Sequence, residues 1–240
     1  MRNALKAMIP LPVRESLRES LGGRIHCRRS YSQEGEDLVL GRMFDDRPAG
    51  VYVDVGAHHP FRFSNTCLLH ERGWRGINID ACPGSMRLFR RFRPNDVNLE
   101  IGVSERPSRL EFFVFAEPAL NTFDADLAKS RQDEGWAFVE RIPVECRPLA
   151  QIIDEQLPRL GATGIDVLTI DAEGFDLQVL RSNDWDRYRP SAVVVEILGS
   201  DIGQMMVSPT ALFLSHLGYA PAVKLHNSVV FAPANRPTPQ

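Results

Sequence analysis

Carboxylic acids end several apolar, β-branched segments of this 240-residue chain. Asp54 and Gly56 come at the end of Val51–Val55, and Asp80 follows Gly76–Ile79. In open α/β sheets, ligands bind outside the carboxyl ends of the strands, and a glycine there lets the backbone approach a nucleoside closely. The spacing therefore indicates a nucleoside site in which Asp80 accepts hydrogen bonds from ribose hydroxyls. The alternatives are a tight turn at Gly56 and a helix N-cap at Asp80.

The residues after Gly56 exclude one class of ligand. They read Ala57-His58-His59-Pro60, so the chain has no glycine-rich turn that could hold a pyrophosphate. This pattern argues against NAD or FAD as the ligand.

A second acidic group follows the apolar segment Ile165–Ile170 and interrupts Ala192–Ile197. Asp171 and Glu173 would repel each other unless a proton, a cation or a positively charged ligand lies between them. Glu196 would lie at the neighbouring strand end, and oxygen ligands suit a hard ion. We therefore expect Asp171, Glu173 and Glu196 to hold Mg²⁺. The alternative is that they bind backbone amides and the ligand without a metal.

Apolar segments that alternate with helical patterns must position these acids, and this alternation predicts βαβ units around a largely parallel sheet. The expected strands are Val51–Val55, Gly76–Ile79, Val97–Val103, Ile165–Ile170 and Ala192–Ile197, with a closing hairpin of Tyr219–Lys224 and Ser228–Phe231. Arg109–Phe115 and Phe138–Arg147 are expected as inserted strands. The expected helices are Glu36–Phe44, Asn65–Glu71, Ser85–Phe92, Leu149–Glu155, Phe175–Arg181 and Pro209–Leu217. Residues 1–30 are expected to form a helical arm, and residues 31–240 the main domain.

Composition excludes several classes of protein. The net charge of −3, with 43% hydrophobic and 25% charged residues, is typical of a globular protein without a basic field for nucleic acid. The segment Met86–Arg93 has apolar residues at helical spacing with arginines opposite, which favours an amphipathic surface helix over a nucleic-acid site. Ala192–Leu198 is too short to span a bilayer. Four cysteines without a CxxC pair are expected to be reduced, so we expect a cytoplasmic protein.

Six segments, in order, resemble the FkbM family of S-adenosylmethionine-dependent methyltransferases over about Tyr31 to Phe231. They are Tyr31–Asp37 (YSQEGED), Tyr52–Pro60 (YVDVGAHHP), Phe63–Thr66 (FSNT), Gly73–Asp80 (GWRGINID), Glu117–Phe123 (EPALNTF) and Asp171–Gly174 (DAEG). One departure is His58, where the family pattern leads us to expect Asn.

The resemblance implies a Rossmann-like class I methyltransferase fold: a seven-stranded, mainly parallel sheet with a C-terminal antiparallel hairpin and an inserted β segment. It also implies S-adenosylmethionine as methyl donor. The hydroxyl acceptor would belong to a saccharide or glycosylated metabolite, as in polysaccharide biosynthesis. Alternatives are a non-sugar secondary metabolite and a nucleoside-binding module without turnover. The expected donor-binding residues are Ser32, Gln33, Asp54, Gly56, Ala57, Asp80 and Ser104, and the expected acceptor-binding residues are Asn65, Thr66, Asn121 and Thr122.

Methyl transfer to a hydroxyl also requires a group that removes the hydroxyl proton. A histidine is suited to this role near neutral pH. We expect His59 or His226 as the base, in that order, and Asp171 if no metal is bound. The expected partner is a small-molecule or oligosaccharide acceptor, without nucleic acid or stable membrane insertion, and the expected assembly is a homodimer.

Overall fold

Parallel strands form the centre of the fold, as the alternation of strand and helix patterns predicts. The computed structural model describes residues 13, 27–198 and 201–235. The chain divides into two units, Met1–Ser30 and Tyr31–Gln240, and the arm predicted for residues 1–30 lies almost wholly outside the described residues. The description below concerns Tyr31–Gln240.

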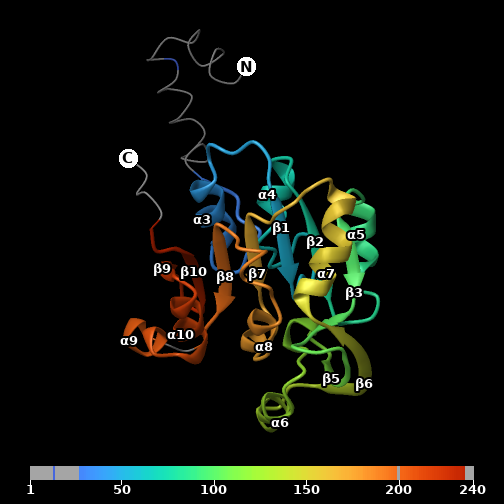
Figure 1. Ribbon diagram of the computed structural model, residues 1–240. Coiled ribbons are helices and arrows are strands. Elements are labelled where there is room, and N and C mark those ends of the chain that lie inside the picture. Colours follow the sequence, from blue (N-terminus) through green and yellow to red (C-terminus); the bar gives the residue numbers. More distant parts are fainter. Residues whose placement is uncertain (1–12, 14–26, 199–200, 236–240) are drawn as a thin grey trace. The chain divides into compact units, whose positions relative to one another are not determined.

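The main sheet has seven strands in the order β3-β2-β1-β7-β8-β10-β9 (Figure 1). The neighbours from β3 to β8 are parallel, whereas β10 runs antiparallel to both β8 and β9. The bounds are β1 Val51–Val55, β2 Arg75–Asp80, β3 Val97–Glu100, β7 Val167–Ile170, β8 Ala192–Glu196, β9 Tyr219–Lys224 and β10 Ser228–Pro233. The strand order reverses at β1, so the ligand crevice is expected where β1 and β7 end. The predicted class I methyltransferase fold, with its closing hairpin, is confirmed.

A second sheet lies beyond the carboxyl ends of the main strands and has the order β4-β6-β5 (Figure 1). Its strands are β4 Gly102–Val103, β5 Ser108–Phe115 and β6 Phe138–Arg147. The single strand predicted over Val97–Val103 is wrong, because it divides at Ile101 into β3 and β4. Gly102 pairs with Cys146, and a Cβ on Gly102 would lie 2.8 Å from the Phe123 ring. A larger residue at this position would collide with Cys146 and Phe123 where the chain changes sheets.

Eight α-helices and two 3₁₀ segments are found among residues 27–198 and 201–235. The α-helices are α3 Glu36–Met43, α4 Cys67–Glu71, α5 Met86–Phe92, α6 Ala125–Asp133, α7 Leu149–Gln156, α8 Asp176–Arg181, α9 Ile202–Met206 and α10 Pro209–His216. The 3₁₀ segments are η2 Pro118–Leu120 and η3 Leu157–Leu160. All six predicted helices are present with shifts of one or two residues at their ends, whereas α6 and α9 were not predicted.

Two hydrophobic clusters cover opposite faces of the main sheet. Val53 and Val55 of β1 pack in one cluster with residues of α7, α8 and α10. Tyr52 of β1 packs in the other with residues of α3 and α4. This alternation follows from the two-residue period of a strand. It also places Asp54 on the α4 side of the sheet, with Tyr52.

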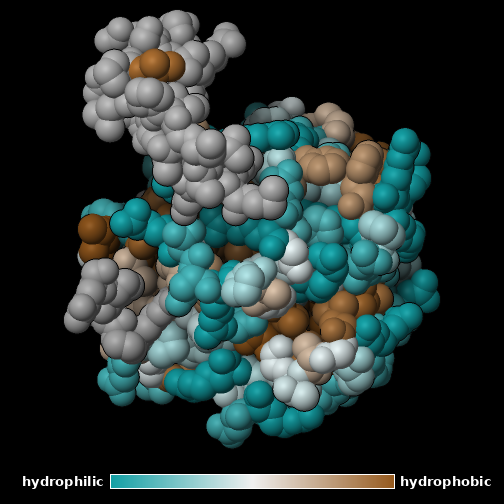
Figure 2. All heavy atoms as spheres, turned by 90° about the horizontal axis from the view of Figure 1, so that it is seen from above, coloured by the Kyte–Doolittle hydropathy of each residue, from teal (hydrophilic) through white to brown (hydrophobic). Residues whose placement is uncertain are grey.

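The described surface is mostly polar where it can be seen from above (Figure 2). Hydrophilic residues cover most of this face, and hydrophobic residues show between them in smaller areas. Within the described residues, no helix is both long enough and apolar enough to cross a bilayer.

Candidate active site

A cavity of about 420 Å³ opens at the carboxyl ends of β1, β2 and β7. The main sheet contributes Val55 and Ile79 to its wall, and the inserted sheet contributes Val103 and Phe112. The cavity therefore lies where the reversal of strand order places a ligand, and the inserted strands form part of its wall.

The cavity brings together about half of the residues that the sequence predicts for the site. Those that line it are Gln33, Gly56, His59, Asp80, Asn121, Asp171 and Glu173. Those that do not line it are Ser32, Asp54, Ala57, Asn65, Thr66, Ser104, Thr122, Glu196 and His226.

Gly56 brings the ends of β1 and β7 into contact. Its φ of 79° is in the left-handed region, and a Cβ there would collide with the carbonyl oxygen of Asp171. The N–H groups of Gly56 and Ala57 donate to the carbonyl oxygen of Ile79, at 2.9 and 3.0 Å. Gly56 thus fixes three strand ends at the base of the cavity, while Ala57 is buried behind it.

Asp80 lines the cavity at the end of β2 with both carboxylate oxygens hydrogen-bonded to backbone. The N–H of His58 donates to Oδ2 and the N–H of Cys82 donates to Oδ1, each at 2.8 Å. Burial raises the pKa of Asp80, although these two bonds act to lower it. Asp80 therefore shapes the loop after β1 and keeps oxygen lone pairs available for a further donor.

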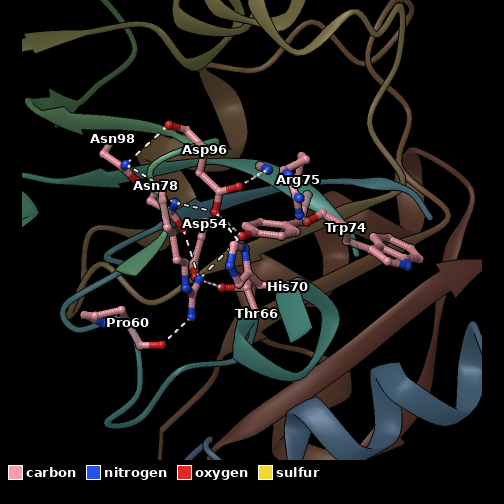
Figure 3. Close-up of polar contacts among 12 residues, drawn as sticks. Asp54, Pro60, Thr66, His70, Trp74, Arg75, Asn78, Asp96 and Asn98 are labelled. Carbon is pink, nitrogen blue, oxygen red and sulfur yellow. Dashed lines mark hydrogen bonds and ion pairs between the residues drawn. The ribbon is translucent and has the colours of Figure 1, made fainter. Parts of the chain in front are cut away.

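Asp54 does not line the cavity and lies in a buried polar network (Figure 3). Its Oδ2 accepts a hydrogen bond of 2.7 Å from the hydroxyl of Thr66, which in turn accepts one of 2.9 Å from Arg93 Nη1. Burial raises the pKa of Asp54 to about 6, against the lowering effects of Thr66 and Arg93. Asp54 and Thr66 therefore do not face the cavity themselves. They flank the loop between them, and that loop lines the cavity.

Other predicted binding residues use their polar groups within the fold. The Ser32 hydroxyl accepts the N–H groups of Gly35 and Asp37 at the start of α3. Asn65 donates to the hydroxyl of Thr169 on β7 at 2.9 Å. The Ser104 hydroxyl donates to the carbonyl oxygen of Arg106 at 2.7 Å. These bonds leave Gln33 and Asn121 as the polar residues of the predicted sets, besides the acids and His59, that reach the cavity.

Asn121 and Thr122 connect the inserted segment to the cavity. Asn121 Oδ1 accepts the N–H of Phe115, which holds the buried side chain in place at the cavity wall. The Thr122 hydroxyl donates to the carbonyl oxygen of Glu173 at 2.7 Å. The inserted segment therefore fixes the backbone around the acidic residues after β7.

Three histidines differ in their relation to the cavity. His58 and His59 both line it, and burial lowers the pKa of each, so both rings are neutral near pH 7. His59 Nδ1 accepts the N–H groups of Phe61 and Arg62 at 3.1 and 3.0 Å. A neutral His59 therefore carries its proton on Nε2. His226 is exposed in the turn between β9 and β10 and does not line the cavity.

The acidic cluster after β7 and β8 comprises Asp171, Glu173 and Glu196. One oxygen from each lies within 4.8 Å of the others. Desolvation and mutual repulsion raise the pKa of Asp171 well above its ordinary value and that of Glu196 to about 8. Arg131 of α6 forms an ion pair with Glu173, whose φ of 49° is left-handed. The cluster thus includes one acid held by an arginine and two that repel each other.

Four buried polar atoms of cavity-lining residues have no hydrogen-bond partner among the described residues: His58 Nε2, Ser85 Oγ, Asn121 Nδ2 and Asp171 Oδ1. Buried polar atoms are nearly always hydrogen-bonded, so such atoms in a cavity wall mark the places where a ligand contributes the missing partner. The acidic cluster offers only carboxylate oxygens as metal ligands, and Asp171 Oδ1 has no other partner in the described part of the chain. Such a set of ligands fits a hard cation.

Sequence reasoning missed His58, Arg93 and Arg131. His58 lay within the predicted loop but was set aside for His59, and its side-chain environment depends on how the loop folds. Arg93 was expected on the exposed side of an amphipathic helix, but it follows the last residue of α5 and is only 1% exposed. Arg131 belongs to the unpredicted α6, and its ion pair with Glu173 joins distant segments.

Comparisons with known proteins give a family and two structural likenesses. A family model described as the methyltransferase FkbM domain matches residues 54–221. No curated protein matches the chain. A solved structure of a "putative RNA methyltransferase" from Pyrococcus horikoshii has 10% identity and a TM-score of 0.40, over 83% of each chain. A "putative O-methyltransferase" from Klebsiella pneumoniae has 13% identity and a TM-score of 0.41, over 97% of this chain and 94% of that one.

Proposed function

Because this chain belongs to the FkbM methyltransferase family, we propose that it methylates a hydroxyl group of a saccharide or glycosylated metabolite. The family implies S-adenosylmethionine as methyl donor. The observation that carries the proposal is the cavity at the ends of β1, β2 and β7, whose wall contains the unpartnered His58 Nε2 and Asp171 Oδ1. One or both of these atoms would meet the reacting groups.

The donor supplies a methyl group on a positively charged sulfur, and the C–S bond breaks as the acceptor oxygen forms the new C–O bond. The chain must then align the acceptor with the donor and accept the hydroxyl proton. In the proposal, Asp80 binds the ribose, and Gly56 lets the backbone lie against the donor. Gln33 and Asn121 contribute further hydrogen bonds from the cavity wall.

His58 is the proposed proton acceptor, together with Asp171 in the arrangement without a metal. Burial and neighbouring acids raise the pKa of Asp171, which favours its uptake of a proton. The neutral ring of His58 can accept a proton at Nε2 if its own proton is on Nδ1. His59 uses Nδ1 for two backbone N–H groups, so its neutral ring has no free lone pair. We therefore place His58 before His59 in this role, and leave the exposed His226 out of it.

A saccharide acceptor is supported by aromatic rings on the loop after β1. Phe61 and Phe63 are 38% and 40% exposed, and Phe63 lines the cavity. Ring faces of this kind offer apolar surface to the C–H faces of a sugar, while polar groups nearby bind its hydroxyls. A polyketide hydroxyl or a carboxylate is the competing acceptor.

A screen of acceptors tests the proposal directly. Purified protein is incubated with methyl-labelled S-adenosylmethionine and separate sets of oligosaccharides, glycosylated metabolites, phenols, lipids and nucleic acids. We expect label in a carbohydrate fraction. The variant Asp171→Asn serves as the control for non-enzymatic transfer. Label confined to non-carbohydrate acceptors would replace the proposed acceptor and leave methyl transfer intact.

The proposal also includes Mg²⁺ at the acidic cluster, where Asp171 and Glu196 would hold the ion and Glu173 would lie near it. The support is the set of three oxygen ligands within 4.8 Å, and the competing arrangement is the ion pair of Glu173 with Arg131. Calorimetric titration of EDTA-treated protein with Mg²⁺ should show binding that Glu196→Gln weakens. Absence of heat, together with full methyl transfer after EDTA treatment, would leave the cluster as a metal-free acidic site.

A cytosolic location completes the proposal. Cys67, Cys82 and Cys146 are free thiols in the structure. Free thiols are typical of proteins in a reducing compartment.

A further inference from the structure

The loop of residues 57–65 builds one wall of the cavity in an unfavourable backbone conformation. His58 and Phe63 have φ values of 52° and 57°, in the left-handed region that residues with a Cβ rarely adopt. Both residues line the cavity, as do His59 and Arg62 from the same loop. Such a conformation persists only where surrounding contacts impose it. The source of these contacts therefore determines the shape of the cavity wall.

Arg93 supplies contacts on both sides of Phe63. Its Nη2 donates to the carbonyl oxygen of Pro60 and to the hydroxyl of Ser64, the latter at 2.9 Å. Its Nη1 donates to the hydroxyl of Thr66 at 2.9 Å, directly after the loop. A guanidinium is a planar group with several donors in fixed directions, so it can hold these points of the loop together.

The sheet provides a fixed base for Arg93. Its Nη1 also lies 3.5 Å from the hydroxyl of Tyr52 on β1 and 3.5 Å from Asn78 Oδ1 on β2. Asp96 accepts hydrogen bonds from both Tyr52 and Asn78, and Asp54 accepts one from Thr66. The carboxylates of Asp96 and Asp54 are therefore hydrogen-bonded to groups that Arg93 contacts. Their negative charges compensate the burial of the positive charge of Arg93.

From these contacts we propose that Arg93 is a positioning residue: it fixes the loop of residues 57–65 against β1 and β2 and so presents His58 and the cavity wall to the methyl donor. Arg93 does not line the cavity, so it acts through the loop. The inference rests on the proposed function, because it assumes that the cavity binds S-adenosylmethionine.

The test compares Arg93→Ala and Arg93→Lys with Arg90→Ala. Arg90 lies in α5, three residues before Arg93, but is exposed and pairs with Glu100, so it is the matched control. We expect both Arg93 variants to bind S-adenosylhomocysteine about tenfold or more weakly in calorimetry, because neither side chain can hold two sides of the loop. Hydrogen exchange of the amides in residues 57–65 should accelerate in both, and remain as in the wild type in Arg90→Ala.

Chemical rescue distinguishes positioning from general stability. Millimolar guanidinium chloride should restore ligand affinity and slow exchange in Arg93→Ala, since the ion can enter the vacated space. Urea, which has a similar shape without charge, should restore neither. A purely structural contribution of Arg93 would lower the melting temperature without any guanidinium-specific recovery of affinity, and that result would overturn the proposal.

Other results with these variants also test the positioning role of Arg93. Wild-type affinity and wild-type loop exchange in a folded Arg93→Ala would overturn the proposal. If Arg93→Ala does not fold, Ser64→Ala removes one of the same bonds, and unchanged affinity and exchange in that variant would overturn it as well. Failure of the wild type to bind S-adenosylhomocysteine would refute the proposed function instead, while loop exchange in the Arg93 variants would still measure positioning.

Discussion

Asp80 is the residue predicted to bind the ribose. In the structure its carboxylate also accepts hydrogen bonds from the backbone N–H groups of His58 and Cys82. Substitution Asp80→Ala should weaken S-adenosylhomocysteine binding by about 1–3 kcal/mol through loss of charge-assisted hydrogen bonds. Calorimetric titration measures the change. Glu100→Ala at the end of the neighbouring strand is the control and should leave the affinity as it is. Unchanged affinity in Asp80→Ala would remove this residue from the donor site.

The buried carboxyl of Asp54 should make stability depend on pH. Burial raises its pKa from 3.8 to about 6, so the folded state binds this proton more tightly than the unfolded state does. The stabilisation is complete below pH 3.8 and is lost as the pH rises through 6. Between pH 4.5 and 8, this group alone should lower the free energy of unfolding by about 2 kcal/mol.

Urea denaturation at the two pH values tests this expectation with Asp54→Asn, which can still accept the Thr66 hydrogen bond. The wild type should lose about 2 kcal/mol more than this variant on going to pH 8. Asp126→Asn, exposed on α6, should behave as the wild type. Equal losses in the wild type and Asp54→Asn would contradict the raised pKa of Asp54.

At the scale of the elements, the contact between the ends of β1 and β7 depends on Gly56. Gly56→Ala should cost about 2–4 kcal/mol of stability, because the Cβ meets the Asp171 carbonyl oxygen and the backbone is left-handed. Gly135→Ala is a matched control: φ is 92°, but no atom lies within 4 Å of the added Cβ. It should cost only about 1 kcal/mol, from conformation alone. Denaturation curves of both variants give the comparison, and equal costs would show that the two strand ends can separate freely.

The elements themselves follow closely from hydrophobic patterning. Every strand of the main sheet was predicted within one or two residues at each end except over Val97–Val103, which divides because the chain changes sheets at Gly102. Helix α6 was missed because six of its nine residues are polar, and Ala128 is its buried apolar residue. It is held instead by the Asp124 cap and by Arg131.

At the scale of the whole molecule, the cavity and both sheets belong to the unit Tyr31–Gln240. A chain that begins at Cys27 should therefore bind S-adenosylhomocysteine within about twofold of the full chain and retain its circular dichroism spectrum. Titration of both chains under identical conditions makes the comparison. A loss of binding in the shortened, folded chain would show that residues 1–26 contribute to the site.

The sequence by itself determined the order of strands and helices, because that order follows from local periodicity. It also determined which acids lie at strand ends, because that depends only on position along the chain. It also carried the family motifs. Only the tertiary structure decided how the side chains were used. It bonded Asp54 to Thr66 outside the cavity wall, buried Arg93 beneath the loop and paired Arg131 with Glu173. These outcomes depend on contacts between distant segments, and a local pattern of residues does not specify which segments meet.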